Sequence, residues 1–87
     1  MSTIEKKIYS KWYQKIENGT KKFELRLADF SSNKGDRLIL KEWNPKTRQY
    51  TGKEIEKKIT QVIKTKDINY WTQEEIDKYG LQIIFFD

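Results

Sequence analysis

The sequence predicts an α+β fold in which short strands are combined with two short helices. Apolar side chains recur at helical spacing between residues 9 and 16, which predicts the first helix. Thr72 and Glu75 have the spacing of a capping box and Gly80 follows, so a second short helix is expected there. Other stretches alternate apolar and charged residues, or are rich in β-branched and aromatic residues, as strands are.

The first 26 residues predict a strand, a helix and a second strand. We expect a short strand at residues 6–9 and a helix over residues 11–18 with Ser10 as its N-cap. Gly19 follows the helical periodicity and can adopt the left-handed backbone conformation that ends many helices. Apolar and charged side chains then alternate over residues 22–26, which predicts a half-buried strand.

The remaining stretches predict two loops and two strands. Residues 28–34 are polar and loop-like, and the turn-forming pair at 35–36 leads into a strand over residues 37–43. An Asn–Pro pair breaks that strand and opens a loop over residues 44–52. Residues 81–86 are strongly apolar, which predicts a last strand that is covered on both faces.

Residues 52–64 are consistent with a helix and with a strand. Their apolar residues recur at helical spacing, and Thr51 with Glu54 has the spacing of a capping box. However, β-branched residues occupy most of these apolar positions, and three isoleucines among them also share one face of a strand. The residues alone leave strand and helix open for 53–64.

A charged motif lies between the first predicted helix and the strand that follows it. Residues 19–26 read GTKKFELR and contain the spacing GxKxxExR. Glu24 and Arg26 share one face of the predicted strand, and the long side chain of Lys21 can swing over that face. Two interpretations follow: three charges that converge on a ligand, or a solvated strand edge whose ion pair has little energetic value.

These residues give the chain a resemblance to a known family. With Gly19, Lys21, Glu24 and Arg26 in place, the sequence resembles the ASCH domain of the PUA-like superfamily, whose signature is GxKxxExR. The resemblance extends over about residues 6–63 and is to a small stand-alone bacterial and phage type. Members of that type usually begin with a His-containing strand. This chain has no His, so no role of that His is carried over.

The resemblance implies a fold and a domain boundary. Residues 1–87 would form a single ASCH/PUA-like domain, a small PUA-like β-barrel of about five to six strands with two short helices. PUA-like domains place a long strand after the turn that corresponds to residues 50–52. We therefore predict a strand, not a helix, for residues 53–64.

Composition limits the kinds of site and the compartment. The 87 residues include no Cys and no His, and no stretch has the spaced acidic residues of a calcium loop. We therefore expect no metal ion and no cofactor. No apolar run reaches the length of a membrane span, and the N-terminus lacks the hydrophobic stretch of a secretory signal. These features predict a cytoplasmic protein without a membrane partner.

Positive charge is concentrated in the first three quarters of the chain. Residues 1–66 contain 17 Lys and Arg against 8 Asp and Glu, a net charge of +9, whereas residues 67–87 contain 1 Lys against 5 acids, a net charge of −4. A basic body attracts polyanions. Ordinary proteins can also be rich in Lys, but the ASCH resemblance favours RNA or a nucleotide as the partner.

Glu42 is a candidate because of its place in the strand over residues 37–43. It shares strand phase with Leu38 and Leu40, so it would face the core near the strand end, at the mouth of the barrel. A carboxylate there needs a counterion, which Lys21 or Arg26 could supply. If the strand has already frayed at this point, Glu42 is simply solvated.

Aromatic and basic residues near the 44–52 loop fit single-stranded nucleic acid. Trp43 and Tyr50 offer faces on which unpaired bases can stack, and nearby basic side chains can contact phosphates. The basic candidates are Lys41, Lys46 and Arg48. Alternatively, the aromatic side chains pack over the open end of the barrel.

The resemblance implies first of all a binding function. The chain would be a nucleic-acid-binding module, for RNA in particular, or a nucleotide-binding module. Its cleft would be lined by Lys21, Glu24, Arg26, Glu42 and Trp43. A phage-type interaction protein that uses the fold only as a scaffold is a further alternative.

The other class of function is a small amidohydrolase. Some ASCH proteins remove the acetyl group from acetylated cytidine, and others are linked to RNA cleavage. In such an enzyme Lys21 would act as the base and Glu74 or Glu75 as the acid. Glu24 stands where the hydrolases carry a catalytic Thr, so in this chain Glu24 could instead activate water while Lys21 polarises the scissile carbonyl.

Overall fold

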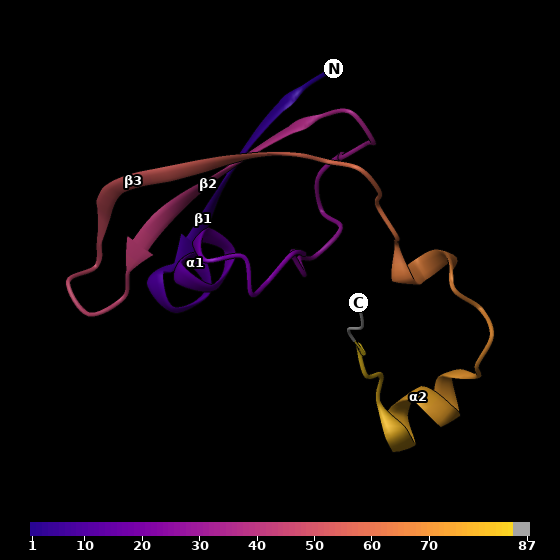
Figure 1. Cartoon of the computed structure of the whole chain (residues 1–87). Coiled ribbons are helices and arrows are strands. Elements are labelled where there is room, and N and C mark those ends of the chain that lie inside the picture. The colour runs from indigo at the N-terminus through magenta and orange to yellow at the C-terminus, as the bar shows by residue number, and fades with distance from the viewer. Residues whose placement is uncertain (85–87) are drawn as a thin grey trace.

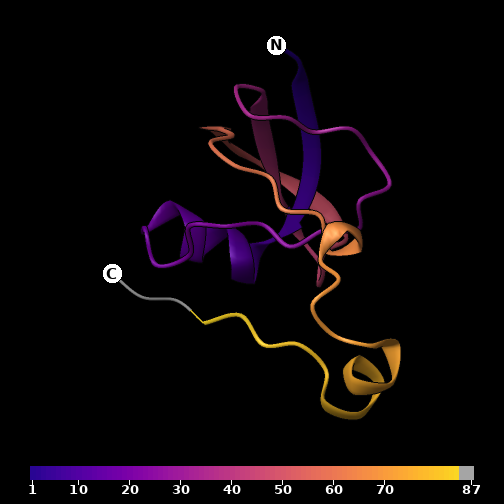
Figure 2. The same ribbon diagram turned by 90° about the vertical axis from the view of Figure 1, so that its right-hand side faces the viewer.

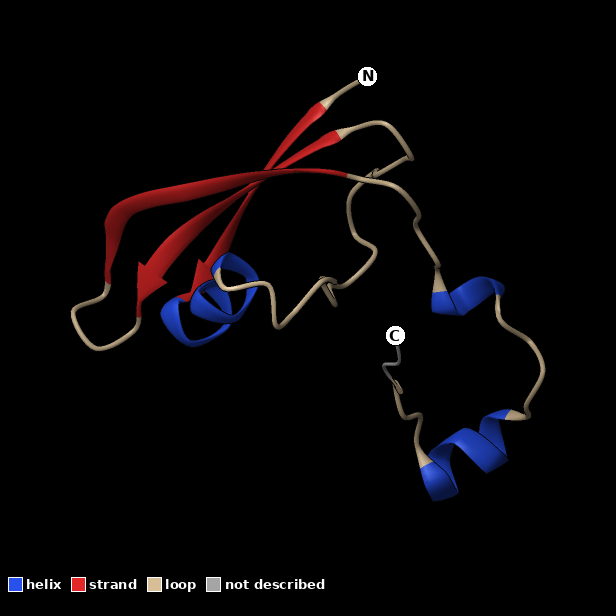
Figure 3. Ribbon diagram, viewed as in Figure 1, coloured by secondary structure: helices blue, strands red, loops and turns tan. Residues whose placement is uncertain are grey.

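Within residues 1–84 the sheet has three strands and is open. The computed structural model describes residues 1–84, in which the strands are β1 (Thr3–Tyr9), β2 (Arg37–Asn44) and β3 (Gln49–Lys58). Strand β2 lies in the middle, parallel to β1 and antiparallel to β3 (Figure 3). The predicted PUA-like barrel of five to six strands is therefore wrong: the described residues form a small mixed sheet with two α-helices.

The core lies between the sheet and helix α1 (Ser10–Glu17), which follows β1 directly (Figure 1). Tyr13 and Ile16 are three residues apart and therefore share one face of the helix. They pack with Ile8 of β1 and Leu40 of β2 as the buried apolar cluster of the described chain. Four buried apolar side chains among residues 1–84 are few, so each one contributes a large share of the stability.

Helix α1 begins one residue earlier than predicted. Tyr9, with an extended backbone, takes the N-cap position, so the prediction of Ser10 as the N-cap is wrong. The Ser10 hydroxyl instead donates to the backbone carbonyl of Trp43 at 3.3 Å. This bond ties the start of the helix to the end of β2.

Residues 22–26 do not form the predicted strand. Their charged side chains bind one another, and the Arg26 Nη2 group donates to the backbone carbonyl of Lys7 in β1 at 2.6 Å. At this carbonyl of β1, the donor is thus an arginine side chain and not the backbone N–H of a further strand. Residues 22–26 therefore show the alternating pattern of a strand but pair with no strand in the described chain.

The strand prediction for residues 52–64 is confirmed only in its first part. Strand β3 ends at Lys58, and Ile59 then exchanges backbone bonds of 2.8 and 2.9 Å with Gly35 and Asp36. No strand follows up to residue 84. The helical alternative is wrong because Ile55 pairs with Leu40 across the sheet and packs against the core.

A bulge shapes the end of the β2–β3 hairpin. Lys41 pairs with Glu54 and Trp43 pairs with Tyr50, so extra residues of β3 lie opposite Glu42. Gly52 in this bulge has a φ of +91°, in the region that favours glycine. The loop is shorter than the predicted 44–52 because β3 already begins at Gln49.

After β3 the chain leaves the sheet. It passes through one turn of 3-10 helix, η1 (Thr65–Asp67), and then helix α2 (Gln73–Tyr79), which lies apart from the sheet in both views (Figures 1 and 2). Residues 81–84 do not form the predicted strand, and residues 85 and 86 lie outside the described part. Within residues 1–84, no helix combines the length and the apolar composition that crossing a bilayer needs.

The predicted capping box of α2 is confirmed. The Thr72 hydroxyl accepts from the Glu75 backbone N–H at 3.1 Å, and the Glu75 carboxylate accepts from the Thr72 backbone N–H at 2.9 Å. Gly80 occupies the C-cap, as expected. Local capping signals therefore define both ends of this helix.

Asp36 fastens the start of β2 to the N-terminus. Its buried carboxylate accepts from the backbone N–H groups of Ser2 and Asn33, both at 2.9 Å. The bond from Ser2, aided by the bond from Asn33 and by the N-terminal charge, lowers the pKa of Asp36 against the opposing effect of burial. The charged form of this carboxyl group is therefore the one that stabilises the fold.

We expect acid to remove this stabilisation. Because the pKa of folded Asp36 is lowered, its contribution is complete above the ordinary carboxyl pKa of about 4 and is lost as the pH falls below that value. Asp36→Asn cannot accept at both positions, so it should lower the Tm at neutral pH. The difference from wild type should shrink below about pH 4 in thermal unfolding followed by circular dichroism. A difference that stays constant with pH would contradict the assignment.

Candidate functional site

Three charged side chains of the GxKxxExR motif converge. Lys21 Nζ lies 2.8 Å from Glu24 Oε1, and Arg26 Nε lies 2.7 Å from Glu24 Oε2. Both oxygens of Glu24 are thus engaged, and the side chains of Lys21 and Glu24 are largely buried, at 13% and 14% exposure. We call Lys21, Glu24 and Arg26 the charged triad. It holds two cations on one carboxylate, a net charge of +1.

The backbone around the triad is fixed at both ends. Gly19, with a φ of +82°, ends α1, and the Lys21 N–H donates to the Lys15 carbonyl at 2.9 Å, which folds the segment back onto the helix. At the other end, Arg26 is bonded to the Lys7 carbonyl of β1. The segment therefore spans from the end of α1 to the edge of the sheet.

Aromatic rings hold the Lys21 ammonium in place. Its Nζ atom lies 4.9 Å from the ring centroid of Phe23 and 5.4 Å from that of Trp12. Together with the bond to Glu24, these contacts restrict a side chain that is otherwise long and flexible.

A cavity of about 450 Å³ opens beside the triad. Its apolar floor includes Ile16 of α1 and Leu38 and Leu40 of β2. Phe23, Phe30 and residues 57–64 also line it. The cavity is thus lined by residues of β1, α1, β2 and the end of β3.

The rim of this cavity is strongly cationic. The basic residues that line it are Lys6, Lys21, Lys22, Arg26, Lys57, Lys58 and Lys64. Glu24 is the one acid among the described lining residues. A cationic rim over an apolar floor suits a ligand that combines an anionic group with a flat or apolar body.

Glu42 lies outside this cavity. It is buried on the core face, as the strand phase predicted, and accepts from the Thr51 hydroxyl at 2.7 Å. The expected counterions Lys21 and Arg26 bind Glu24 instead. Burial raises the pKa of the Tyr13 phenol, and the nearby carboxylates, Glu42 among them, add to this effect.

The predicted nucleic-acid residues form a separate group at the end of the β2–β3 hairpin. The rings of Trp43 and Tyr50 meet edge to face with centroids 5.0 Å apart, and Lys7 Nζ lies 4.5 Å from the Trp43 centroid. Lys46 and Arg48 lie in the adjoining turn, and Lys41 Nζ is 3.5 Å from a carboxylate oxygen of Glu5. Trp43 therefore does not line the cavity beside the triad. The sequence analysis expected Trp43 in the cleft with Lys21, Glu24 and Arg26, and the other four residues outside it.

The two carboxylates proposed as catalytic acids lie on α2. The bond from the Thr72 backbone lowers the pKa of Glu75, which is engaged in the capping box. Neither Glu74 nor Glu75 lines the cavity with Lys21 in the described chain. No group of three potential metal-ligating side chains occurs among residues 1–84.

Several cavity residues were missed by the sequence reasoning. Lys6 has a detectable signal: it shares strand phase with Ile4 and Ile8 and so lies on the core face of β1. Its Nζ atom lies 3.8 Å from the ring centroid of Phe30. Lys57 has the same signal, because it shares strand phase with Ile55. The lysines at 58 and 64 have none, because they reach the cavity only when β3 pairs with β2.

Comparison with known proteins yields a family and one curated relative. Residues 3–75 match the model of a family described as "Domain of unknown function (DUF3850)". The chain is 32% identical over 72 residues to the "Uncharacterized 12.9 kDa protein in GpA 3'region" of Escherichia phage P2. The alignment covers 83% of this chain and 62% of that relative, so the chain spans less than two thirds of the relative's length. No solved structure matches.

The match includes the parts that build the candidate site. All three strands, helix α1, the charged triad and the walls of the cavity lie within residues 3–75. The phage relative is consistent with the bacterial or phage type expected from the sequence.

Proposed function

We propose that this chain, which belongs to the DUF3850 family of domains, is a nucleic-acid-binding or nucleotide-binding module, with RNA as the expected nucleic acid. The ligand would enter the cavity beside Lys21, Glu24 and Arg26. One observation carries the proposal: seven basic residues and a single acidic residue line a cavity that also has apolar lining residues.

A nucleotide matches both features of the cavity. Its phosphate is attracted by Lys and Arg side chains, which supply most of the affinity in nucleic-acid complexes. Its base is flat and can stack on aromatic side chains such as Phe23 and Phe30, which line the cavity. The cavity volume of about 450 Å³ is within the usual range for a small ligand.

The triad presents its cations in a fixed arrangement. Lys21 gives one of its three N–H donors to Glu24, which leaves two for a ligand. Arg26 uses Nε and Nη2, and within the described chain its Nη1 group donates no hydrogen bond. The Glu24 carboxylate thus orients Lys21 and Arg26 but leaves each of them N–H donors for a ligand. Because the two side chains are already ordered, binding costs less conformational entropy.

The ASCH resemblance supports the same function. The four signature residues Gly19, Lys21, Glu24 and Arg26 are those that build the triad and its turn. The barrel that the resemblance implied is not part of the proposal. For the hydrolase alternative, no described residue supplies the second carboxylate beside Lys21, so no specific observation favours it.

Binding of single-stranded RNA at increasing salt tests the proposal. We expect a fluorescein-labelled RNA 12-mer to bind, with affinity that falls steeply as the salt concentration rises, because basic side chains displace counterions from phosphates. Fluorescence anisotropy from about 50 to 200 mM salt measures this slope. Absence of binding at the lowest salt would refute the proposal. Incubation with acetylated cytidine tests the hydrolase alternative separately, since cytidine would be released.

A further inference from the structure

We infer that the ligand is a single strand of RNA that occupies two adjoining cavities with consecutive nucleotides. The inference rests on the proposed function, because the first nucleotide is the one bound beside the triad. It adds a second subsite and selects RNA over a free nucleotide and over DNA.

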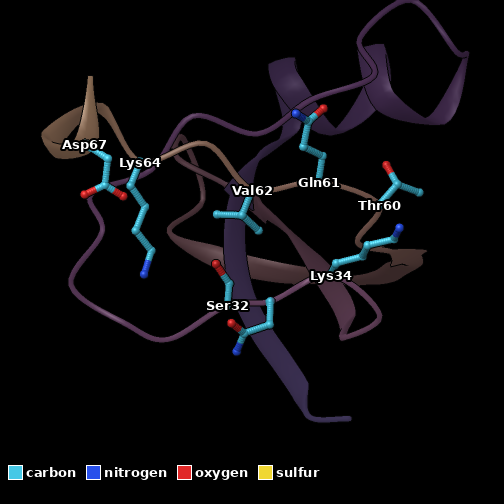
Figure 4. A pocket seen from close by; sticks show the side chains of 8 residues that line it. Ser32, Lys34, Thr60, Gln61, Val62, Lys64 and Asp67 are labelled. Atoms are coloured by element: carbon cyan, nitrogen blue, oxygen red, sulfur yellow. The ribbon is translucent and has the colours of Figure 1, made fainter. Parts of the chain in front are cut away.

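The second cavity has a volume of about 590 Å³ and lies between two loop segments (Figure 4). Ser32, Asn33 and Lys34 come from the loop before β2. Residues 60–67 contribute the other side, after β3. The two segments are held together by the backbone bonds between Ile59 and the turn at 35–36, so this second cavity is built on the end of the sheet.

The two cavities share one wall. The residues that line both are Ser32, Thr60, Gln61, Val62 and Lys64. A ligand that continues past this wall therefore passes from the first cavity into the second. Lys64 lies at the junction, where the phosphate between two nucleotides would pass.

The chemistry of the second cavity differs from that of the first. Half of its lining residues carry neutral groups that both donate and accept hydrogen bonds: the hydroxyls of Ser32 and Thr60 and the amides of Asn33 and Gln61. The other half are Lys34, Lys64, Val62 and Asp67, whose carboxylate can accept from a ribose hydroxyl. These groups match a ribose, whose 2′-hydroxyl is also donor and acceptor and distinguishes RNA from DNA. Aromatic side chains are absent among its described lining residues, so it suits a sugar and phosphate more than a stacked base.

The polar side chains of the second cavity are not used within the fold. In residues 1–84, the side chains of Thr60, Gln61 and Lys64 make no hydrogen bond or ion pair. The same holds for Ser32 and Lys34. Lys34 and Lys64 stand on the two sides of the cavity, and both ammonium groups are free to approach a phosphate.

Short defined ligands test the inference. Uridine 5′-monophosphate and the 5′-phosphorylated RNA diuridylate are titrated by calorimetry against wild type, Lys34→Ala and Lys53→Ala. We expect the dinucleotide to bind wild type at least about tenfold more tightly than the mononucleotide. Lys34→Ala should remove most of this gain and leave mononucleotide binding unchanged. Lys53→Ala, a lysine on β3 that lines neither cavity, should leave both unchanged.

The outcomes separate the two proposals. If the mononucleotide binds but the dinucleotide binds no more tightly, or Lys34→Ala leaves the dinucleotide affinity unchanged, the second subsite is overturned and the proposed function stands. If the DNA dinucleotide of the same sequence binds as tightly as the RNA, the assignment to RNA is overturned. If neither ligand nor a longer RNA binds, both proposals fail together.

Discussion

Leu40→Ala is expected to lower the free energy of unfolding by about 2–5 kcal/mol. Leu40 is only 1% exposed and lies in the middle of β2, with Lys6 of β1 on one side and Ile55 of β3 on the other. Truncation removes apolar contacts and leaves a void in a core of few residues, which has little capacity to collapse around it. Small domains have about 5–15 kcal/mol of stability in total, so this loss is a large fraction of it.

Urea denaturation followed by tryptophan fluorescence measures this effect. Leu27→Ala is the matched control, because the same atoms are removed from a side chain that is 81% exposed. That variant should change the free energy of unfolding by less than about 0.5 kcal/mol. Equal effects at the two positions would show that Leu40 does not pack in the core described above.

Elements with a complete local signal could be predicted from the sequence. Helix α2 has a capping box at its start and Gly80 at its end, and both were found where the sequence indicated. Strand β2 was predicted over all but its last residue because a glycine turn precedes it and a proline follows it. These signals lie within a few residues of the element that they define.

The sheet could not be predicted in the same way, because a strand needs a partner. Residues 22–26 have the alternation of a half-buried strand, yet Glu24 and Arg26 bind each other and the edge of β1 through side chains. Residues 81–84 are apolar, yet they neither pair nor become buried in the structure. Hydrophobic pattern reports which residues favour a strand, whereas pairing depends on distant parts of the chain.

The candidate site also has one part that the local sequence predicts and one part that depends on tertiary structure. The charged triad lies within six residues, so the spacing of the motif was enough to bring Lys21, Glu24 and Arg26 together. The rest of the cavity depends on tertiary structure, since residues 57–64 reach it only through the register of β3 on β2. Glu42 and Trp43 were expected in the cleft with the triad, but neither lines the cavity beside it. In the bulge at Gly52, the Thr51 hydroxyl bonds to Glu42 and the Tyr50 ring contacts Trp43.

Lys21→Ala is expected to weaken binding of single-stranded RNA about 10- to 100-fold at low salt. This range corresponds to the loss of one charge-assisted hydrogen bond, about 1.5–3 kcal/mol, to a phosphate. The dependence of log affinity on log salt should become shallower by about one, because one fewer cation contacts the strand. Arg26 keeps its bond to Glu24 in the variant, so the fold should be retained, which circular dichroism can verify.

A control variant at a lysine outside the cavity distinguishes a local role of Lys21 from general attraction of RNA by the positive charge of the chain. Lys53→Ala removes the same charge from β3, away from both cavities, and should weaken binding less than about threefold. A local site requires the two variants to differ, whereas diffuse attraction makes them equal because each lowers the net charge by one. Equal losses for Lys21→Ala and Lys53→Ala would therefore place RNA binding outside the cavity beside the triad, even if binding itself is observed.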